Sequence, residues 1–351
     1  MKNILLINNG YPSKKNKQYT AYIKSIKESL ESSGEKVDLL VMYADFGNGK
    51  FSKIAAYLKY YLKLLFFKDY KKYDYIYMNN YPHSFLPLTM RLRFMKNLII
   101  HWHGADIFAE KVHSKILNKV SYWFIPKSCK HIVPSHYFAN AVANTLNLDL
   151  QDIFVSASGG VNTNTFIPKK KQKDGFHIGF ASHVSKEKGF DIFAKMIDDA
   201  EFLEKRFEIK LYFHYISYGT ETEFYAEKFR GNNRVQIHGL YPKDEMSNFY
   251  AEIDLLLLLS TRLAESLGLV SLEAMSCDVP VVGTDAFAVK EYILDEQTGE
   301  RFEMRNYNAM TDAIEKVIKN YDKYNPRDFI VQNYSTQSVA DGYKEYFDAI
   351  K

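Results

Sequence analysis

The chain contains the stretch Glu265-Ser-Leu-Gly-Leu-Val-Ser-Leu-Glu273-Ala-Met-Ser-Cys-Asp-Val-Pro-Val-Val-Gly-Thr284, which follows a run of five leucines, Leu255 to Leu259. The leucine run is short, apolar and bounded by polar residues, which is typical of a buried strand in a parallel sheet. A polar loop with Gly268 comes next, and apolar residues at helical spacing then lead to Pro280 and a second apolar strand. The pattern therefore predicts a strand, a loop, a helix and a strand, in that order.

A unit of this kind favours binding of an anion at the start of its helix. The first amides of a helix lack internal partners and attract phosphate, and Gly268 has no side chain that would block a ligand. Glu265 lies in the loop and Glu273 about one turn (roughly 6 Å) further along the helix. The two carboxylates would accept hydroxyls from the two ends of a sugar nucleotide, with the diphosphate between them. The alternative is that both are solvated surface carboxylates.

The segment resembles the Glu-x7-Glu signature of the retaining GT-B glycosyltransferases of family 4, whose usual form is E-x-F-G-L-x-x-x-E-A-M-A-x-G-x-P-V-V. Leu267 stands in place of the usual Phe, and Asp278 in place of the usual Gly. The resemblance implies a GT-B fold, in which two Rossmann-like domains with doubly wound parallel sheets face a central cleft. It also implies that seven residues of this segment bind the donor: Glu265, Ser266, Leu267, Gly268, Leu269, Val270 and Glu273.

Length and composition agree with a two-domain globular protein. A chain of 351 residues can bury two cores, and its 46% apolar and 25% charged content is ordinary. A net charge of +4 is too small to argue for nucleic acid, so we expect no such partner. Cys129 and Cys277 have no C-x-x-C spacing and predict reduced thiols. We find no signal peptide or membrane-spanning run, and we expect a cytoplasmic protein whose membrane contact, if any, is peripheral.

Strands alternate with helices in the first half, which predicts a parallel sheet with ligands beyond the carboxyl ends of its strands. The predicted strands are Ile4–Ile7, Lys36–Met42, Tyr75–Met78 and Asn97–Trp102, and the predicted helices are 18–33, Phe51–Phe67 and Ser84–Phe94. We assign 1–168 to an acceptor-side domain and 175–334 to a domain that binds the nucleotide sugar. The polar run Pro168–Gly175 is the predicted linker. In GT-B proteins the terminal helix, here 335–351, packs back on the first domain.

The loop after the first strand differs from the family pattern. Family 4 members usually carry Gly-Gly there, near the phosphates of the donor, whereas this chain has only Gly10 in a predicted turn over Asn9–Ser13. The resemblance places Gly10 among the donor-binding residues. Three lysines, Lys14, Lys15 and Lys17, follow it.

The predicted helix Phe51–Phe67 combines an apolar stripe with lysines. The stripe has helical spacing and consists of Phe51, Ile54, Ala55, Leu58, Tyr61, Leu62 and Leu65. Between Lys50 and Lys72 seven lysines meet one acid, Asp69. One interpretation is that the stripe packs on the sheet and the lysines face water. The other is a basic, aromatic surface that contacts anionic lipid headgroups peripherally.

His101-Trp-His103-Gly104-Ala-Asp106 follows an apolar strand. Alternation places His101 and His103 on one side of the segment, but no further pattern completes a metal-ligand set. The segment resembles the H-G-x-D motif of family 4. The resemblance implies that His103 contacts the donor sugar at the reaction centre. Asp106 either caps the following helix or lies on the acceptor side.

The second half opens with Ser182-His183-Val-Ser-Lys-Glu-Lys188-Gly189, which resembles the family motif G-R-L-x-x-x-K-G. The Arg and Lys of that motif clamp the diphosphate. Lys188 matches, whereas His183 occupies the Arg position and offers one donor in place of a charged, bidentate fork. Further on, His238-Gly239 resembles the strand end whose backbone contacts the base of the donor.

The resemblance as a whole implies a retaining transferase that moves a hexose from a nucleotide diphosphate to a hydroxyl of a glycan or lipid-linked glycan, in the assembly of cell-surface polysaccharide. The expected donor is a UDP-sugar, with GDP-mannose as the alternative. His103, Glu265 and Lys188 are the expected catalytic residues. No Asp-x-Asp occurs in the sequence, so we expect no metal and no cofactor.

Three other functions share parts of these features. A GT-B nucleotide-sugar epimerase has the same architecture and would be distinguished by product analysis without acceptor. A non-catalytic subunit of a glycosyltransferase complex tends to lose the acidic pair, and both glutamates are present here. A glycosyl phosphorylase needs a lysine for pyridoxal phosphate and a far longer chain.

Overall fold

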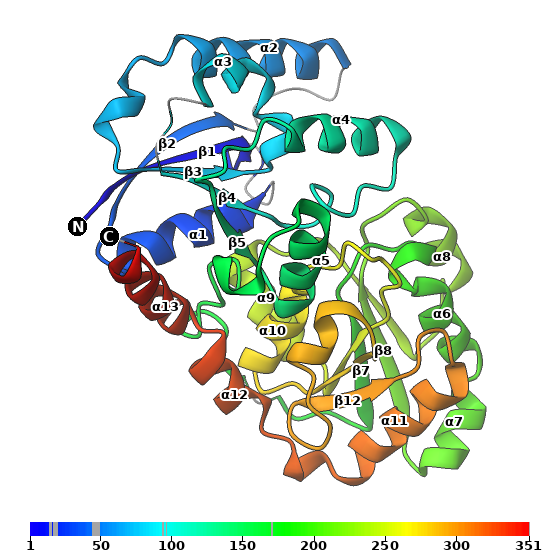
Figure 1. The fold of residues 1–351 in the computed structure, drawn as a ribbon. Helices are drawn as coiled ribbons and strands as arrows, with labels where there is room; N and C mark the ends of the chain where they lie inside the picture. Colours follow the sequence, from blue (N-terminus) through cyan, green and yellow to red (C-terminus); the bar gives the residue numbers. More distant parts are fainter. Residues whose placement is uncertain are drawn as a thin grey trace. The chain divides into compact units, whose positions relative to one another are not determined.

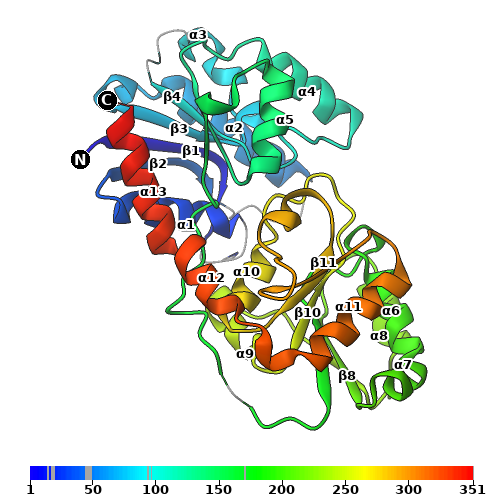
Figure 2. The same ribbon diagram turned by 60° about the horizontal axis from the view of Figure 1, so that its bottom comes forward.

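A computed structural model describes residues 1–13, 16, 20–43, 50–92, 95, 97–169 and 171–350. The chain forms two compact units, and we describe each by itself (Figures 1 and 2). The first unit consists of Met1–Gly160 with Thr336–Lys351, and the second of Val161–Ser335. The lysines 14, 15 and 17, which the sequence places after the first strand, lie outside the described residues.

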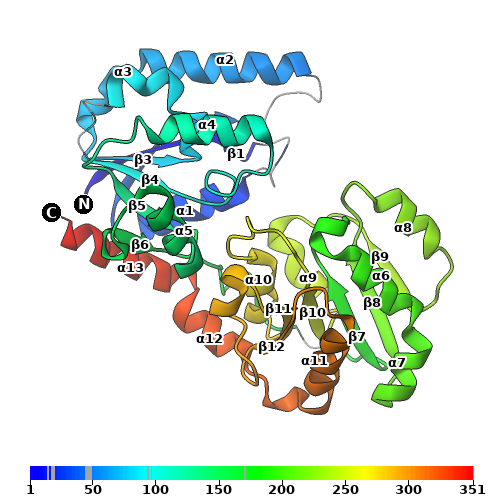
Figure 3. The same cartoon turned by 45° about the vertical axis from the view of Figure 1, so that its right-hand side comes forward.

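The first unit contains a six-stranded parallel sheet in the order β2-β1-β3-β4-β5-β6. Its strands are β1 (Asn3–Tyr11), β2 (Lys36–Tyr43), β3 (Tyr75–Asn79), β4 (Leu98–His101), β5 (Lys130–Val133) and β6 (Ile153–Val155). Its helices are α1 (Ala21–Ser32), α2 (Lys50–Phe66), α3 (Thr89–Leu92), α4 (Val112–Tyr122), α5 (His136–Leu146) and α13 (Thr336–Ala349), with the short 3-10 helices η2 (Tyr81–His83) and η3 (Leu86–Leu88). In Figure 3, α2, α3 and α4 cover one face of this sheet, and α1 and α13 lie against the other.

The terminal helix α13 is part of the first unit because its buried tyrosine reaches the centre of that sheet. The Tyr343 hydroxyl lies 2.9 Å from the Tyr77 hydroxyl of β3, and both side chains are fully buried. α13 also packs along α1.

The second unit contains a parallel sheet in the order β12-β11-β10-β7-β8-β9. Its strands are β7 (Phe176–Phe180), β8 (Leu211–Ile216), β9 (Val235–His238), β10 (Leu255–Leu258), β11 (Val281–Thr284) and β12 (Gly299–Phe302). Its helices are α6 (Phe190–Asp198), α7 (Ala200–Phe207), α8 (Thr222–Lys228), α9 (Met246–Tyr250), α10 (Leu269–Ser276), α11 (Tyr307–Lys319) and α12 (Pro326–Asn333). The leucines of β10 are fully buried at the middle of this sheet, as the leucine run predicts.

The boundary between the units falls earlier than residue 168. Residues 161–168 belong to the second unit because Val161 bridges to Ser335 and the buried Phe166 packs against Tyr250. The predicted linker Pro168–Gly175 also lies on the second unit. Lys169, Lys171 and Lys173 are held there by ion pairs and hydrogen bonds, including an ion pair of 2.5 Å from Lys173 to Asp254.

Two predicted elements of the first half have different boundaries. β1 continues to Tyr11, so Gly10 lies in a strand rather than in a turn, and the Asn8 side chain donates to its carbonyl. In place of the helix predicted over Ser84–Phe94, the structure has η3 followed by the four-residue α3, and residues 93 and 94 lie outside the described ranges.

The orientation of α2 is opposite to the first interpretation of its sequence. Except for the half-buried Tyr61, the predicted stripe faces outward, and Phe51, Ile54 and Leu58 are 60–88% exposed. The opposite face is buried instead: Tyr60 and Leu64 are 0–1% exposed, and the Tyr60 hydroxyl lies 2.8 Å from the Ser84 hydroxyl. Within the described ranges, no helix is both long and apolar enough to cross a membrane.

Candidate active site

The candidate site of the second unit lies where its strand order reverses. The chain runs outward from β7 to β8 and β9, and then returns to the other side of β7 with β10, β11 and β12. Sheets of this kind bind ligands beyond the carboxyl ends of the two strands that flank the reversal, here β7 and β10. The loops 182–189 and 260–268 follow these two strands.

Lys188 and Glu265 meet at this point. The Lys188 Nζ lies 2.5 Å from Glu265 Oε2, and the two side chains are 18% and 11% exposed. The two loops are joined by the backbone amide and hydroxyl of Thr261, which both donate to the carbonyl of Glu187. Gly189 allows the close approach, because a Cβ at this residue would lie 2.5 Å from the carbonyl oxygen of Leu259.

The electrostatic environment keeps Glu265 ionised. Burial raises the pKa of its carboxyl, but the charge and hydrogen bond of Lys188, the hydroxyl of Ser260 and the charge of Arg262 outweigh burial, so that the pKa is lowered. Lys188 and Arg262 thus place two cations beside the Glu265 carboxylate, with the exposed Glu187 carboxylate 3.9 Å from Arg262. Such a site can accept hydroxyls at Glu265 while it attracts a phosphate group to the cations.

Helix α10 begins beside this pair. Its N-cap is Gly268, in the left-handed region at φ 55°, and Leu269 and Val270 form the first turn, half-buried. Ser266 is half-buried in the preceding loop and Leu267 is 1% exposed. The amides of the first turn have no partners within the helix and provide a second attraction for an anion.

Glu273 lies one turn into α10 and is 7% exposed. The Tyr250 hydroxyl donates to its Oε2 at 3.0 Å. Burial raises the pKa of Glu273, and the charge of Lys243 and the Tyr250 hydroxyl offset the increase only in part. Tyr218 lies near both acids, since burial and the charges of Glu265 and Glu273 raise its pKa. The two glutamates therefore belong to one cluster.

Two hydroxyls behind α10 are buried without a hydrogen bond of normal geometry. They are Tyr292 Oη and Ser271 Oγ. Tyr292 is fully buried, and its hydroxyl occupies the space that a Cβ on Gly268 would enter, 2.4 Å away. This hydroxyl fixes the backbone of the loop at the start of α10.

Replacement of Gly268 by alanine is expected to lower the Tm of the protein by about 5–10 °C, because the Cβ clashes with Tyr292 and the positive φ is strained. Thermal unfolding followed by circular dichroism measures the change. The double variant Gly268→Ala/Tyr292→Phe lacks the clashing hydroxyl and should recover part of the loss. A Tm equal to the wild type in the single variant would contradict this account of the loop.

His183 stands beside the same site. Its ring packs edge-on against Tyr218, with centroids 5.2 Å apart. Gly219 makes room for it, because a Cβ there would lie 2.9 Å from His183 Nδ1. His183, which occupies the position of the family arginine, is thus in contact with Tyr218, the tyrosine near Glu265 and Glu273.

His238 is part of a chain of three histidines that crosses β7, β8 and β9. The Asp174 carbonyl can only accept, so His177 donates to it through Nε2 at 3.1 Å. His214 then donates from Nε2 to His177 Nδ1 at 2.8 Å, and His238 from Nε2 to His214 Nδ1 at 3.1 Å.

The Tyr241 hydroxyl completes this chain by donating to His238 Nδ1 at 3.0 Å. This donor order applies to neutral imidazoles, which the burial of His177, His214 and His238 favours by lowering the pKa of each ring. His238 is 8% exposed, so its ring is committed to the chain, whereas nothing lies within 4 Å of a Cβ built on the adjacent Gly239. Of His238 and Gly239, it is therefore the backbone of Gly239 that a ligand can approach.

The first unit places His101 and His103 together after β4, with ring centroids 4.0 Å apart. His101 is fully buried and its Nδ1 lies 2.8 Å from the Tyr77 hydroxyl. His103 is half-buried, and its Nε2 lies 2.7 Å from Asn79 Oδ1, so it donates to that amide oxygen. Burial lowers the pKa of His103 to about 3, which keeps the imidazole neutral.

Asp106 is turned inward. Its carboxylate accepts the amide of Gly104 at 2.7 Å and the amide of His103 at 3.0 Å, and the residue is 3% exposed. Burial raises its pKa to about 6, against the opposing effect of these amides. The observed contacts make Asp106 a positioning residue of the His103 turn.

Gly10 lies near the carboxyl end of β1, in the strand that pairs with both β2 and β3. It is buried. The side chain of Asn9 joins this end to β3, because it accepts from the Asn80 amide at 2.8 Å. Gly10, Asn9 and the Asn79–His103 pair thus belong to the carboxyl edge of one sheet.

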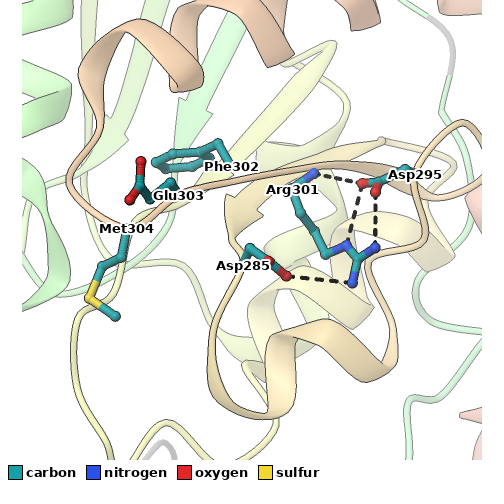
Figure 4. Close-up of a pocket in the computed structure, with 6 residues that line it drawn as sticks. All are labelled: Asp285, Asp295, Arg301, Phe302, Glu303 and Met304. Carbon is teal, nitrogen blue, oxygen red and sulfur yellow. Dashed lines mark hydrogen bonds and ion pairs between the residues drawn. The ribbon is translucent and has the colours of Figure 1, made fainter.

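A separate pocket of about 350 Å³ lies at the ends of β11 and β12 (Figure 4). Arg301 lies on it and is held by Asp295 at 2.9 Å and Asp285 at 3.5 Å. Two carboxylates therefore hold Arg301, and the pocket lies at β11 and β12 rather than at the reversal between β7 and β10. Among the residues that the structure describes, no group of three or more His, Cys, Asp or Glu could hold a metal ion.

Residues 162–333, almost the whole second unit, match the model of the family described as glycosyl transferases group 1. The second unit is thus similar to the group 1 glycosyl transferases. A D-inositol 3-phosphate glycosyltransferase from Paenarthrobacter aurescens is 28% identical over 221 residues, which are 59% of this chain and 52% of that protein. The alignments with the curated relatives cover between 30% and 58% of the length of those proteins.

Solved structures match over the full length. Sucrose-phosphate synthase from Thermosynechococcus elongatus aligns with a TM-score of 0.74 at 14% identity, over 100% of this chain and 99% of that one. HepE from Anabaena in complex with UDP aligns with a TM-score of 0.72 at 17% identity, over 99% of this chain and 100% of that one. The predicted two-domain α/β fold of GT-B type is confirmed.

Several residues of the site were absent from the sequence prediction. Arg262 and Ser260 act on Glu265, Tyr218 feels the charges of both glutamates, and Tyr250 donates to Glu273. Arg262 could have been predicted from the sequence, because it is a cation three residues before Glu265 in the loop after the leucine strand. The tyrosines could not, because the chain has 27 of them.

Proposed function

We propose that the chain is a retaining glycosyltransferase of family 4 that transfers a hexose from a nucleotide-diphosphate sugar to a hydroxyl acceptor. The observation that carries the proposal is the meeting of Lys188, Glu265 and the first turn of α10 at the reversal of the sheet, in a unit that matches the group 1 glycosyl transferase model. A UDP-sugar is the proposed donor, supported by the UDP-bound state of HepE.

The difficult step of such a transfer is departure of the diphosphate as the anomeric carbon becomes positive. Cations and amides that are fixed in place stabilise the leaving charge without rearranging. Lys188 and the amides of Leu269 and Val270 would contact the diphosphate. Because His183 occupies the position of the family arginine, Arg262 would supply the second positive charge. Glu265 would then accept hydroxyls of the hexose, and Glu273 hydroxyls of the ribose.

His103 keeps its proposed role as a contact to the transferred sugar. As a neutral imidazole that donates from Nε2 to Asn79, it has Nδ1 as an acceptor for a sugar hydroxyl. Retention would follow attack from the front face, with the leaving phosphate taking the proton of the acceptor. No metal is required in this scheme, because fixed cations and amides supply the positive charge.

The proposal is tested by release of nucleotide from a panel of UDP-, GDP- and other nucleotide sugars, with and without a chelator. We expect release from one UDP-hexose at a rate that the chelator leaves unchanged. Addition of a glycan or lipid-linked glycan acceptor should raise the rate and yield an α-linked product from an α-linked donor. Loss of activity with chelator would overturn the metal-free scheme, and a changed donor sugar without acceptor would indicate an epimerase.

A further inference from the structure

The outward face of α2 is apolar along its whole length. Six large side chains on it are 40–88% exposed: Phe51, Ile54, Leu58, Leu62, Leu65 and Phe66. At 100° per residue they occupy one continuous sector of about a third of the helix surface. A helix that exposes this much apolar side chain to water marks an interaction surface.

The exposed face is fixed by packing on the other side of the helix. Tyr60 and Leu64 are buried in the core of the first unit, and the Asn9 amide donates to the Tyr57 hydroxyl at 3.0 Å. The Tyr70 hydroxyl donates to the carbonyl of Leu64 at 2.7 Å. Rotation of α2 to hide its apolar face would break these contacts, so exposure is a property of the folded unit.

Helix α4 extends the same kind of surface. Val112, Ile116 and Trp123 are 60–83% exposed and follow one side of the helix. η2 packs on α4 and η3 packs on α2. His83 of η2 lies near both helices. Burial is the main cause of its lowered pKa, and the charges of Lys53 of α2 and His113 of α4 lower the pKa further. We call the six side chains of α2 and these three of α4 the α2–α4 surface.

The charge around the α2–α4 surface is strongly positive. Residues 51–72 and 110–127 carry ten lysines and two acids. Asp69 is already paired with Lys72 at 2.7 Å. These two segments therefore have a local net charge of +8, whereas the whole chain has +4, so the rest of the chain is net acidic. Lys59 and Lys63 lie along one edge of the apolar sector of α2.

We propose that the α2–α4 surface docks on an anionic phospholipid membrane, with the apolar side chains in the headgroup–acyl boundary and the lysines against the lipid phosphates. Apolar sectors flanked by lysine are the chemistry of helices that lie in this boundary. A second copy of the chain would place lysines against lysines, which opposes association. The proposal goes beyond the proposed transfer reaction and does not depend on it, because it concerns the first unit alone.

The test is flotation of the full chain with vesicles of phosphatidylcholine alone or with about one third phosphatidylglycerol. We expect binding to the anionic vesicles, weakened by salt. The variant Leu58→Ser/Leu62→Ser should lose binding roughly tenfold or more, because both side chains are exposed and leave the core intact. Lys59→Gln/Lys63→Gln should weaken binding several-fold and flatten its salt dependence.

Two controls make the result specific. Phe202→Ser/Phe224→Ser removes two side chains of the second unit that are 67% exposed, and it should bind vesicles like the wild type. Trp123 fluorescence should shift to the blue on anionic vesicles, while Trp123→Phe, which keeps the buried Trp102, should show no shift.

Absence of flotation with anionic vesicles, or equal binding by the Leu58→Ser/Leu62→Ser variant, would overturn the proposal. So would light scattering that shows a dimer of the wild type which this variant dissolves, because the surface would then join two copies. Nucleotide release by the wild type and the variant in solution, without vesicles, is measured in parallel. Nucleotide release reports on the transfer reaction, and flotation reports on membrane docking. Failure of one proposal can therefore be told apart from failure of the other.

Discussion

Replacement of Glu265 by glutamine is expected to lower kcat/KM for transfer by about 10²- to 10³-fold while UDP still binds. The carboxylate is held ionised against burial by Lys188, Ser260 and Arg262. Glutamine keeps the size of the side chain and one acceptor oxygen for Lys188, but it loses the charge that would stabilise the positive anomeric carbon. Steady-state kinetics with the donor found by the release screen, together with UDP titration by calorimetry, measures both quantities. Glu265→Ala should abolish transfer.

The matched control is Glu187→Gln, on the loop that joins Glu265 through Thr261. The Glu187 side chain is 70% exposed and its carboxylate approaches Arg262, at 3.9 Å, while its backbone carbonyl accepts from Thr261. This variant should keep near wild-type kcat/KM. A merely structural role of Glu265 would lower UDP affinity and Tm together with the rate, whereas a role at the sugar leaves both unchanged. Near wild-type transfer by Glu265→Gln would remove Glu265 from the site.

The centre of the second unit could be predicted from sequence because its signals are local. The leucine run, Gly268, the helical spacing up to Met275 and Pro280 each specify one element, and the structure has β10, α10 and β11 in these places. The contact of Lys188 with Glu265 is different. It joins residues 77 positions apart, and it depends on the pairing of β7 with β10, which no single segment encodes.

The orientation of α2 could not be predicted because this helix is apolar on two sides. Tyr57, Tyr60 and Leu64 form a second stripe opposite to the one that the sequence suggests. Periodicity establishes that the segment is helical, but it cannot choose between two apolar faces. The choice is made by partners elsewhere in the chain, chiefly Ser84 and Tyr70, which satisfy the polar groups of the buried face.

Acidification from pH 7 to pH 5 is expected to destabilise the second unit, with about 2 kcal/mol of the loss arising from His214 alone. Burial and the neighbouring His177, His238 and Lys173 lower the pKa of His214 from the ordinary 6.5 to about 3. The folded state therefore binds fewer protons than the unfolded state in this range. The contribution of His214 to the free energy of unfolding is fully present above the unfolded-state pKa of 6.5. It is lost progressively as the pH falls toward 3.

The geometry of the histidine chain agrees with the sign that burial sets. Each imidazole donates through Nε2 and accepts through Nδ1, from the Tyr241 hydroxyl to the Asp174 carbonyl. A proton added at one Nδ1 would require every hydrogen bond from that atom toward Tyr241 to reverse its direction. Glu273 works in the opposite direction, because its raised pKa favours the folded state as the pH falls. The pH dependence of the free energy of unfolding is thus the sum of opposing contributions from His214 and Glu273. A variant of His214 is needed to isolate the contribution of the histidine.

His214→Gln is that variant, because glutamine keeps one donor and one acceptor but does not titrate in this range. Urea unfolding at pH 7 and pH 5 is followed by pulsed hydrogen exchange of peptides from β7 to β9, with labelling at a fixed pH. The variant should lose about 2 kcal/mol less than the wild type between these pH values, even where it is less stable at pH 7. His136→Gln, at an exposed position of α5, should leave the difference unchanged. An equal loss in wild type and His214→Gln would mean that the chain of neutral imidazoles does not set the acid response of this unit.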